Sequence, residues 1–203
     1  MKSNVCSQYR LNSSNRVLQG DILVNLELPY YDVQKEALEI TILNYCVVVS
    51  QDCDLDKDFN LRNDFKNEFG SLNHLNDGDI DRFRKFHDKF LPNILVVEGF
   101  VADSLRTGNH LSDLNLFMDD KGGVNKTPWK KIKQNETPRY HYLYPSDNPK
   151  ISDLVFDFKR YYSVPREYFY KKYGNSYKVS LNELYREDLS QRFTNYLSRI
   201  GLP

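Results

Sequence analysis

The sequence predicts an α+β fold: a small, strongly bent antiparallel sheet or barrel with helices packed on its outside. Alternating apolar segments occur near the N-terminus and again in the second half of the chain, whereas the clearest helical periodicity lies at the C-terminal end. These elements do not follow the strict strand–helix alternation of a doubly wound parallel sheet. The 203 residues are within the size of one hydrophobic core, so we expect residues 1–203 to form a single domain.

Strands are predicted by period-two patterns and by one continuous apolar run. Residues 22–28 alternate after a turn at Gly20, and we expect this strand to stop at residues 29–32, which begin with proline. Residues 37–50 indicate one long bent strand or two short ones, and the continuous run at 46–49 predicts burial on both faces. Further strands are predicted over residues 94–101, 139–144 and 154–162.

Helices are predicted on the outside of the sheet. Residues 52–78 are acidic and weakly patterned, so we expect a surface insertion there, with a short helix near residues 61–69. Asn182 precedes a segment whose apolar residues recur at helical spacing, which predicts a long C-terminal helix. Shorter helices are predicted over residues 79–90, 112–118, 127–133 and 164–173.

The charges sum to zero but are segregated along the chain. Residues 52–120 carry 8 basic and 15 acidic groups, whereas residues 121–203 carry 16 basic and 8 acidic ones. The zero total argues against a dedicated high-affinity nucleic-acid binder, although the basic C-terminal region leaves RNA as a possible partner. The alternative interpretation is that the acidic residues 52–120 and the basic residues 121–203 attract each other within the fold.

Several classes of protein are disfavoured by features that the sequence lacks. No apolar run approaches the roughly 20 residues of a membrane span, and residues 1–15 contain no apolar signal segment, so we expect no membrane partner and a cytoplasmic location. Cys6, Cys46 and Cys53 form no C-x-x-C pair, so we expect reduced thiols and no metal site. The usual nucleotide-binding, zinc-protease and α/β-hydrolase motifs are also missing, and no cofactor is predicted.

One candidate site follows the buried strand that ends near residue 50. Asp52 and Asp54 are candidate catalytic residues, because two nearby carboxylates can share a cation or do acid–base work. Ser50 and Gln51 precede them and are candidate substrate-binding residues. The pattern is not an EF-hand, which needs glycine where Lys57 stands. A solvated acidic turn accounts for the same residues without any chemistry.

A second candidate site lies in the predicted strand at residues 139–144. We expect Arg139 and His141 on one face of this strand and Tyr140 and Tyr142 on the other. His141 is a candidate catalytic residue, while Arg139 and Tyr140 are candidate substrate-binding residues that suit a phosphate and a stacked base. The alternative is a half-buried strand whose polar face meets solvent.

Two resemblances extend these expectations. Residues 20–22, the extended strand and residues 47–50 resemble the N-terminal pattern of MazF/PemK-type toxins, which are SH3-like barrels and many of which cut single-stranded RNA. The Arg-Pro pair that precedes the second strand in those toxins, and whose arginine serves catalysis, is absent from residues 43–46. The resemblance therefore implies the SH3-like barrel more directly than it implies the ribonuclease.

The other resemblance covers most of the chain. Residues 50–55, 139–143, 189–193 and 199–203 resemble a family of uncharacterised bacterial proteins with an SQDCDL motif. This resemblance implies a bacterial or mobile-element origin and a role in defence against phage.

Three functions are compatible with the sequence. The first is an interaction or recognition module of a bacterial multi-component system, with a protein partner. The alternative is an enzyme, either a divergent MazF-like ribonuclease or a metal-dependent one, and the third is a small-molecule or nucleotide sensor. All of them depend on one spatial prediction, that residues 50–54 and 139–141 converge on a shared cleft.

Overall fold

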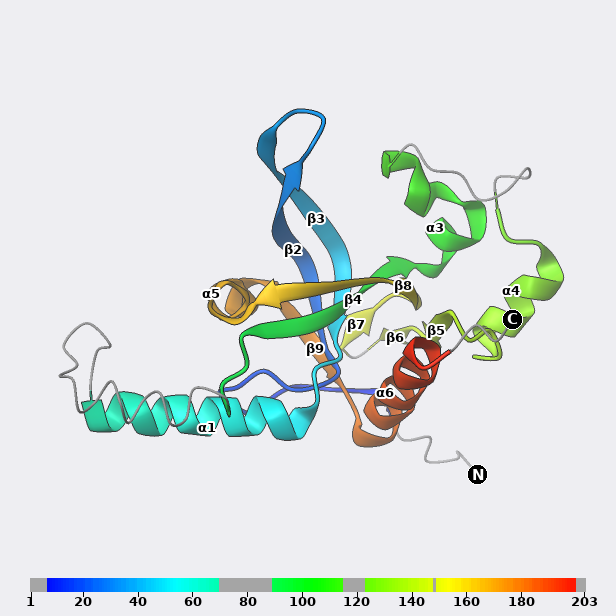
Figure 1. Ribbon diagram of the computed structural model, residues 1–203. Helices are drawn as coiled ribbons and strands as arrows, with labels where there is room; N and C mark the ends of the chain where they lie inside the picture. The colour runs from blue at the N-terminus through cyan, green and yellow to red at the C-terminus, as the bar shows by residue number, and fades with distance from the viewer. Residues whose placement is uncertain (1–6, 70–88, 115–122, 148, 200–203) are drawn as a thin grey trace, which may run out of the picture.

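The computed structural model describes residues 7–69, 89–114, 123–147 and 149–199 (Figure 1). Seven strands form one strongly curled antiparallel sheet, a half-barrel with the order β1-β9-β2-β3-β4-β8-β5. The predicted α+β class with a bent antiparallel sheet and peripheral helices is confirmed. The strands of this sheet are β1 (Tyr9–Arg10), β2 (Asp21–Asp32), β3 (Ala37–Val48), β4 (Asn93–Val101), β5 (Tyr140–Leu143), β8 (Leu154–Pro165) and β9 (Tyr177–Leu181).

Helices surround the sheet, and a short ribbon of β6 (Ser146–Asp147) and β7 (Lys150–Ile151) lies apart from it. The described helices are α1 (Asp52–Phe69), α3 (Ala102–Thr107), α4 (Lys126–Lys133), α5 (Arg166–Ser176) and α6 (Glu183–Leu197), with a 3-10 helix η3 (Asn109–Leu114). The long C-terminal helix is thus confirmed. The predicted helix over residues 79–90 lies almost wholly outside the described residues, as does the end of the one over 112–118.

The strands β2 and β3 are longer than predicted. Instead of stopping at Pro29, β2 continues to Asp32 and pairs with β3 along its length, from Ile22 opposite Val47 to Asp32 opposite Ala37. Proline is tolerated at this position because β9 pairs only with the first residues of β2, which leaves the outer part of β2 as an edge. Residues 24–44, called the arm below, therefore project from the sheet as a two-stranded ribbon (Figure 1).

The predicted insertion over residues 52–78 begins with an 18-residue helix rather than a loop with a short helix near its end. The helix α1 is held to the protein by Leu55, which is buried against α5, and by the buried carboxylate of Asp58. That carboxylate accepts hydrogen bonds from Arg62 at 2.7 Å and Arg166 at 2.8 Å, and from the amide of Leu91 at 2.9 Å. The sequence did not predict this attachment, because an aspartate that is buried and paired cannot be distinguished by sequence from one that is exposed to solvent.

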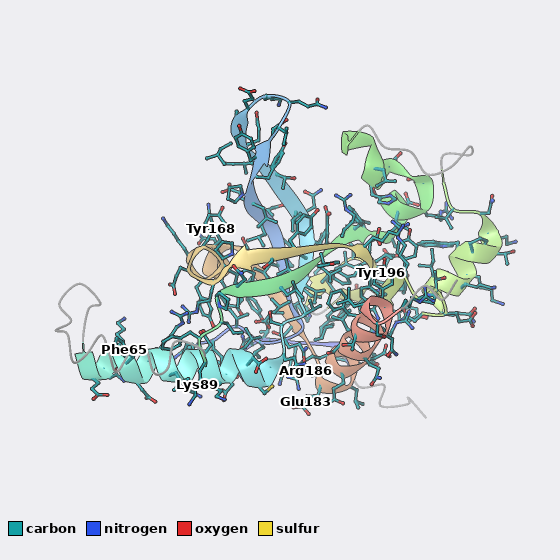
Figure 2. All side chains as sticks on the ribbon, viewed as in Figure 1. Phe65, Lys89, Tyr168, Glu183, Arg186 and Tyr196 are labelled. Carbon is teal, nitrogen blue, oxygen red and sulfur yellow. The ribbon has the colours of Figure 1, made fainter. Side chains whose placement is uncertain are left out.

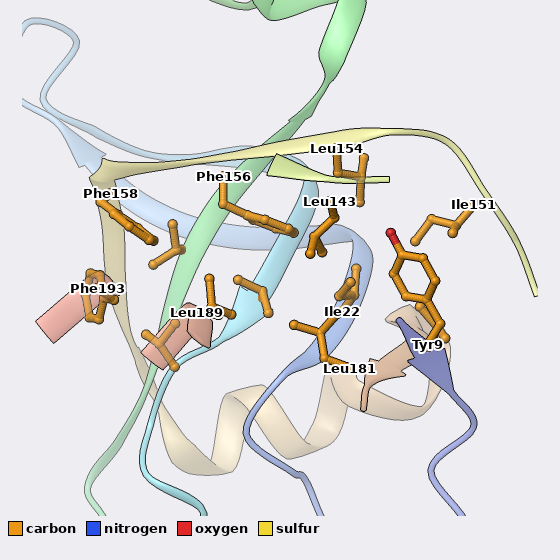
Figure 3. Packing of buried hydrophobic residues seen from close by; sticks show 14 residues of the cluster. Tyr9, Ile22, Leu143, Ile151, Leu154, Phe156, Phe158, Leu181, Leu189 and Phe193 are labelled. Atoms are coloured by element: carbon orange, nitrogen blue, oxygen red, sulfur yellow. The ribbon is translucent and has the colours of Figure 1, made fainter. Parts of the chain in front are cut away.

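The core has two layers, one on each face of the sheet. Figure 3 shows the first layer, in which Phe156 and Phe158 of β8 and Ile22 of β2 pack against Leu189 and Phe193 of α6. The second layer lies on the opposite face, where alternate residues of the same strands meet α5 and α1; it includes Leu23, Cys46, Val48, Ile94, Leu55 and Phe169. The helix α6 thus covers one face of the sheet, and α5 with α1 covers the other.

A buried aspartate joins the N-terminal segment to the end of the sheet. Asp21 is fully buried and accepts hydrogen bonds from the amide of Leu18 at 2.8 Å, from Tyr173 at 2.6 Å and from the hydroxyl of Ser180. Asn12 donates a fourth bond at 3.3 Å. Burial raises the pKa of Asp21, although these donors act in the opposite direction.

We predict that Gly99→Ala destabilises the protein by about 1–3 kcal/mol, the usual range for overpacking a core. A Cβ at Gly99 would lie 2.5 Å from the ring of Phe156, which is held inside the first core layer. Gly174→Ala is the matched control: a Cβ there meets nothing within 4 Å, and alanine favours the helix α5, so we expect a gain of about 0.5–1 kcal/mol. Chemical denaturation of both variants measures the two changes, and equal effects would contradict the close packing at Gly99.

Candidate functional site

Residues 50–54 serve mainly to connect elements of the fold. The hydroxyl oxygen of Ser50 accepts a hydrogen bond from the amide of Leu95 at 2.8 Å, which ties the end of β3 to β4. Asp52 begins α1 and pairs with Arg16 at 3.0 Å and with Arg186 of α6 at 3.5 Å. Figure 2 shows Arg186 where the first turns of α6 approach this end of α1. Partial burial opposes ionisation of Asp52, but Arg16 holds its pKa below the ordinary value.

Gln51 and Asp54 are exposed and lie at an open depression beside α6. This depression has a volume of about 550 Å³, and its other wall includes Ser190, Phe193 and Leu197. Asp52 shares the guanidinium of Arg16 with Asp56, which lies 3.2 Å from it, so these carboxylates are held by an arginine. Within the described residues, no group of three or more histidine, cysteine, aspartate or glutamate side chains is placed to hold a metal ion.

His141 is buried inside the protein. Its side chain is 1% exposed, its ring packs near Phe158, and among the described residues neither ring nitrogen has a hydrogen-bond partner. Asp188 lies 3.9 Å from the imidazole, yet burial, assisted by the charge of Arg192, lowers the pKa of His141 to about 3. The imidazole is therefore neutral near pH 7 and out of reach of solvent, which does not suit acid–base work on a substrate.

Arg139 does not share a face with His141, contrary to the prediction. It precedes β5, and its guanidinium forms two bonds to the fully buried carboxylate of Asp157, at 2.7 and 2.5 Å. The same guanidinium lies over the ring of Tyr140, 4.8 Å from its centre. The expected alternation fails because Arg139 precedes the first residue of β5 and is not held to the geometry of the strand. Its side chain turns toward Asp157, the residue of β8 that pairs with Tyr140.

The two predicted segments face opposite sides of α6. Ser190 and Thr194 line the depression beside residues 50–54, whereas Asp188 approaches His141 and Arg192 donates to the carbonyl of Tyr140 at 2.8 Å. Residues two apart on an α-helix point about 200° away from each other. The depression that contains Ser50, Gln51 and Asp54 includes none of residues 139–141. The geometry therefore gives no support to a catalytic group of Asp52, Asp54 and His141.

A different cleft was not predicted from the sequence. It lies between the base of the arm on one side and α3 with η3 on the other, and its volume is about 570 Å³. The arm and α3 both project from the sheet in Figure 1, and the residues that line the cleft come from these two parts and from the sheet between them. The polar side chains of the cleft come from seven separate elements and include Asn25, Asn44, Glu98, Ser104, His110, Arg160 and Lys178.

A partly buried ion pair forms part of the cleft wall. Glu98 of β4 accepts hydrogen bonds from Arg160 at 2.5 Å and from Tyr162 at 3.0 Å, both on the neighbouring strand β8. Burial and the charge of Glu98 raise the pKa of Tyr162 to about 12. The sequence contained a signal for this pair. Glu98 stands in an apolar run, and Arg160 takes an apolar position of the alternating pattern over residues 154–162, and a charge in such a place needs a partner.

His110 is the second notable group in the cleft. It stands in η3, is 7% exposed and packs its ring edge-on against Phe100, with the ring centres 4.8 Å apart. Burial lowers its pKa, and the nearby backbone of Ser104 only partly offsets this effect. Neither ring nitrogen is placed for a hydrogen bond with a described residue.

The chain matches no family model, no curated protein and no solved structure. In the described part of the chain, no helix combines the length and the apolar character needed to cross a membrane.

We predict that His141 makes the folded protein sensitive to acid. The folded-state pKa of about 3 lies below the unfolded value of about 6.5, so stability is fully present above pH 6.5 and falls as the pH drops toward 3. Between pH 7 and pH 5 this one group removes about 2 kcal/mol.

His141→Phe should abolish that part of the pH dependence, because phenylalanine suits the apolar site beside Phe158 and does not titrate. Urea unfolding of both proteins at pH 7 and pH 5 measures the difference. Parallel losses in the two proteins would show that His141 is already protonated or exposed in the folded state.

Proposed function

We propose that this chain is a protein-interaction module and that the arm is its docking element. The observation that carries the proposal is a row of exposed apolar side chains on β3: Leu38, Ile40 and Ile42 are 79%, 63% and 53% exposed. Because alternate residues of a strand point to the same side, these three form one face. On β2, Pro29 and Tyr31 stand directly opposite Ile40 and Leu38 and widen it. Contiguous apolar surface of this kind is typical of contact sites.

The backbone of the arm supports the same proposal. β3 pairs with β4 only over residues 45–48, so residues 37–44 have one open edge within the described chain. An open edge presents unpaired amide and carbonyl groups that can add a further strand. An added strand would cover the edge, and its side chains would pack beside Leu38, Ile40 and Ile42.

Charge indicates the chemistry of the added strand. The outer part of the arm carries three acidic residues, Asp32, Glu36 and Glu39, against one basic residue, Lys35. Two copies of the arm placed edge to edge would oppose like charges, whereas a strand flanked by lysine or arginine would not. The occupant that we propose is therefore an extended segment of a different protein, apolar at alternate positions and basic at its ends.

This proposal moves the recognition site away from residues 50–54 and 139–141 but keeps the expected protein partner. The bacterial multi-component setting rests on the resemblance alone and is part of the proposal. RNA remains a competing partner, which is tested by adding single-stranded RNA with Mg²⁺ to the same protein and looking for cleavage.

The test uses a synthetic peptide of alternating valine and threonine with two lysines at each end. We expect saturable binding, and we expect Ile40→Asp to weaken it at least tenfold because a central apolar anchor is lost. The matched control is Leu184→Asp, which places the same charge at an equally exposed leucine on α6, 71% exposed. Fluorescence anisotropy of a labelled peptide gives both dissociation constants, and the control should bind like the unchanged protein.

Three results would overturn the proposal. One is equal binding by the Ile40→Asp variant, and another is equal binding of a peptide whose lysines are replaced by glutamate. The third is a dimer in sedimentation experiments that Ile40→Asp dissociates, since the occupant is then a second copy. In the expected complex, hydrogen exchange slows at those amides of residues 37–44 that point to the open edge, because the added strand accepts their hydrogen bonds; the alternate amides already face β2.

A further inference from the structure

The helix α4 presents a basic face on the outside of the protein. Its eight residues contain four lysines and no acidic residue, and all four lysines are exposed. None of the four forms an ion pair with another described residue. Lys126, Lys130 and Lys133 recur at i, i+4 and i+7, so they follow one side of the helix over about 10 Å. Within the described chain, this side of α4 is a row of three uncompensated positive charges.

The apolar side of α4 is already packed on the protein. Ile132 is 2% exposed and lies in a core cluster with Tyr142 of β5. Trp129 meets the ring of Tyr142 edge-on, with the ring centres 6.3 Å apart. A basic amphipathic helix that binds a membrane surface needs a free apolar face. Because this face is covered, a partner of α4 meets the lysines.

An exposed tyrosine stands at the end of the lysine row. Tyr144 is 53% exposed and donates a hydrogen bond to the carbonyl of Lys133 at 3.3 Å. Its own carbonyl accepts a bond from the hydroxyl of Tyr9 at 2.6 Å, and its amide donates to Gln8 at 2.9 Å. The ring of Tyr142 meets it edge-on, with the centres 5.1 Å apart. Tyr144 is therefore an accessible ring that is fixed before any partner arrives, which lowers the entropic cost of binding.

A hollow adjoins this ring on the side away from α4. It has a volume of about 400 Å³, and Tyr144, Pro145 and Tyr185 of α6 line it. One acid is bound to the same group of rings, because Asp153 accepts a hydrogen bond from Tyr142 at 3.1 Å. The three lysines of the row outnumber this acid. The surface thus combines positive charge, an exposed ring and space beside the ring.

Single-stranded nucleic acid matches this combination. Its phosphates carry regularly spaced negative charges that bind lysines, and its bases have flat faces that stack on aromatic rings. A double strand keeps its base faces inside the stack and offers only the phosphates. An acidic polypeptide offers charge without the stacked bases. The lysine row together with Tyr144 therefore favours a single strand.

We propose that α4 and Tyr144 bind single-stranded nucleic acid, with phosphates along Lys126, Lys130 and Lys133 and one base stacked on Tyr144. Phosphates and base faces are common to DNA and RNA, so both bind. No covalent step is involved. Figure 1 shows α4 well separated from the arm, so this surface goes beyond the proposed protein-interaction function, and either proposal can fail while the other stands.

The probe is a labelled thymidine oligonucleotide of about 12 nucleotides, compared with a uridine RNA of the same length. We expect saturable binding at low salt in fluorescence anisotropy. The logarithm of the binding constant should fall with the logarithm of the salt concentration with a slope of about −2, as expected for three phosphate contacts. Trp129 is the single tryptophan of the chain, so a change in its fluorescence shows that the strand lies on α4.

Lys130→Ala combined with Lys133→Ala should weaken binding at least tenfold at low salt and make the salt slope shallower by about 1.4. The bond from Tyr144 goes to the backbone of Lys133 and is kept in this variant. The matched control is Lys57→Ala combined with Lys66→Ala, which removes two exposed lysines from α1. This control should leave both the dissociation constant and the slope unchanged.

Tyr144→Leu removes the stacking ring and should weaken binding at least fivefold, the lower end of the cost of losing such a ring. Tyr144→Phe keeps the ring and should restore most of the binding. Equal binding by these two variants would overturn the proposal, as would a strand that binds without any change in the fluorescence of Trp129.

Four further results would overturn it. They are no binding of either strand at low salt, tighter binding of a duplex of the same length, a tenfold preference for the RNA over the DNA strand, and equal competition by a glutamate peptide of the same charge. The third would mean that the sugar is recognised, and the last would mean that the partner is an acidic polypeptide.

Discussion

The half-barrel depends on the buried carboxylate of Asp21. Its hydrogen bonds reach Tyr173 of α5, Ser180 of β9, the amide of Leu18 and the side chain of Asn12, so one residue at the start of β2 fixes segments that are far apart in the sequence. A buried charge that loses such donors is strongly destabilising, since nothing in the core replaces water. The N-terminal segment, α5 and β9 are therefore expected to order together or not at all, and the remaining strands extend from this fixed end.

The strands β2 and β3 are less buried the farther they extend from Asp21. The residues of β2 and β3 near Asp21 are covered on both faces by the two core layers. At the base of the arm Leu26, Leu28 and Leu43 are still buried, whereas Leu38, Ile40 and Ile42 are exposed. Asn25, with a φ of +52°, marks the change. Leu23 and Leu26 belong to the same core layer although they are three residues apart, so the strand alternation is interrupted between them. The interruption redirects the arm and opens the cleft at its base.

The parts of the fold that follow from local periodicity were predictable. The strand at residues 93–101 carries an apolar run broken only by Glu98 and Gly99, and α6 carries apolar residues at helical spacing; the structure has both where the pattern places them. The strand β9 was missed, because it has only five residues and is decided by its pairing with β2. Likewise, β2 can continue through Pro29 because β9 pairs only with residues 21–23 and leaves the rest of that edge free. Both features depend on pairing between strands that are distant in the sequence, and local sequence patterns do not reveal that pairing.

The expected convergence of residues 50–54 and 139–141 on one cleft is absent for a related reason. The sequence shows that residues 50–54 follow a buried strand and that His141 lies in another strand, but not that α6 stands between them. By contrast, the cleft could have been suspected from the sequence, because Glu98 and Arg160 each place a charge at an apolar position of a predicted strand and pair with each other at 2.5 Å. Opposite charges at apolar positions of two predicted strands therefore indicate that the strands pair and that the site beside them is polar.

The open edge of the arm also bears on how the protein behaves at high concentration. An apolar ribbon with an unpaired edge is a template on which identical ribbons can stack into fibrils. Pro29 removes one amide donor from the edge of β2, and the acidic residues near the turn repel the arm of a second molecule. Mutual repulsion of this kind is weakened by salt and by acid. Colloidal stability in this chain is thus set by the same few carboxylates that discourage self-pairing, and it should be lowest where those groups are screened or protonated.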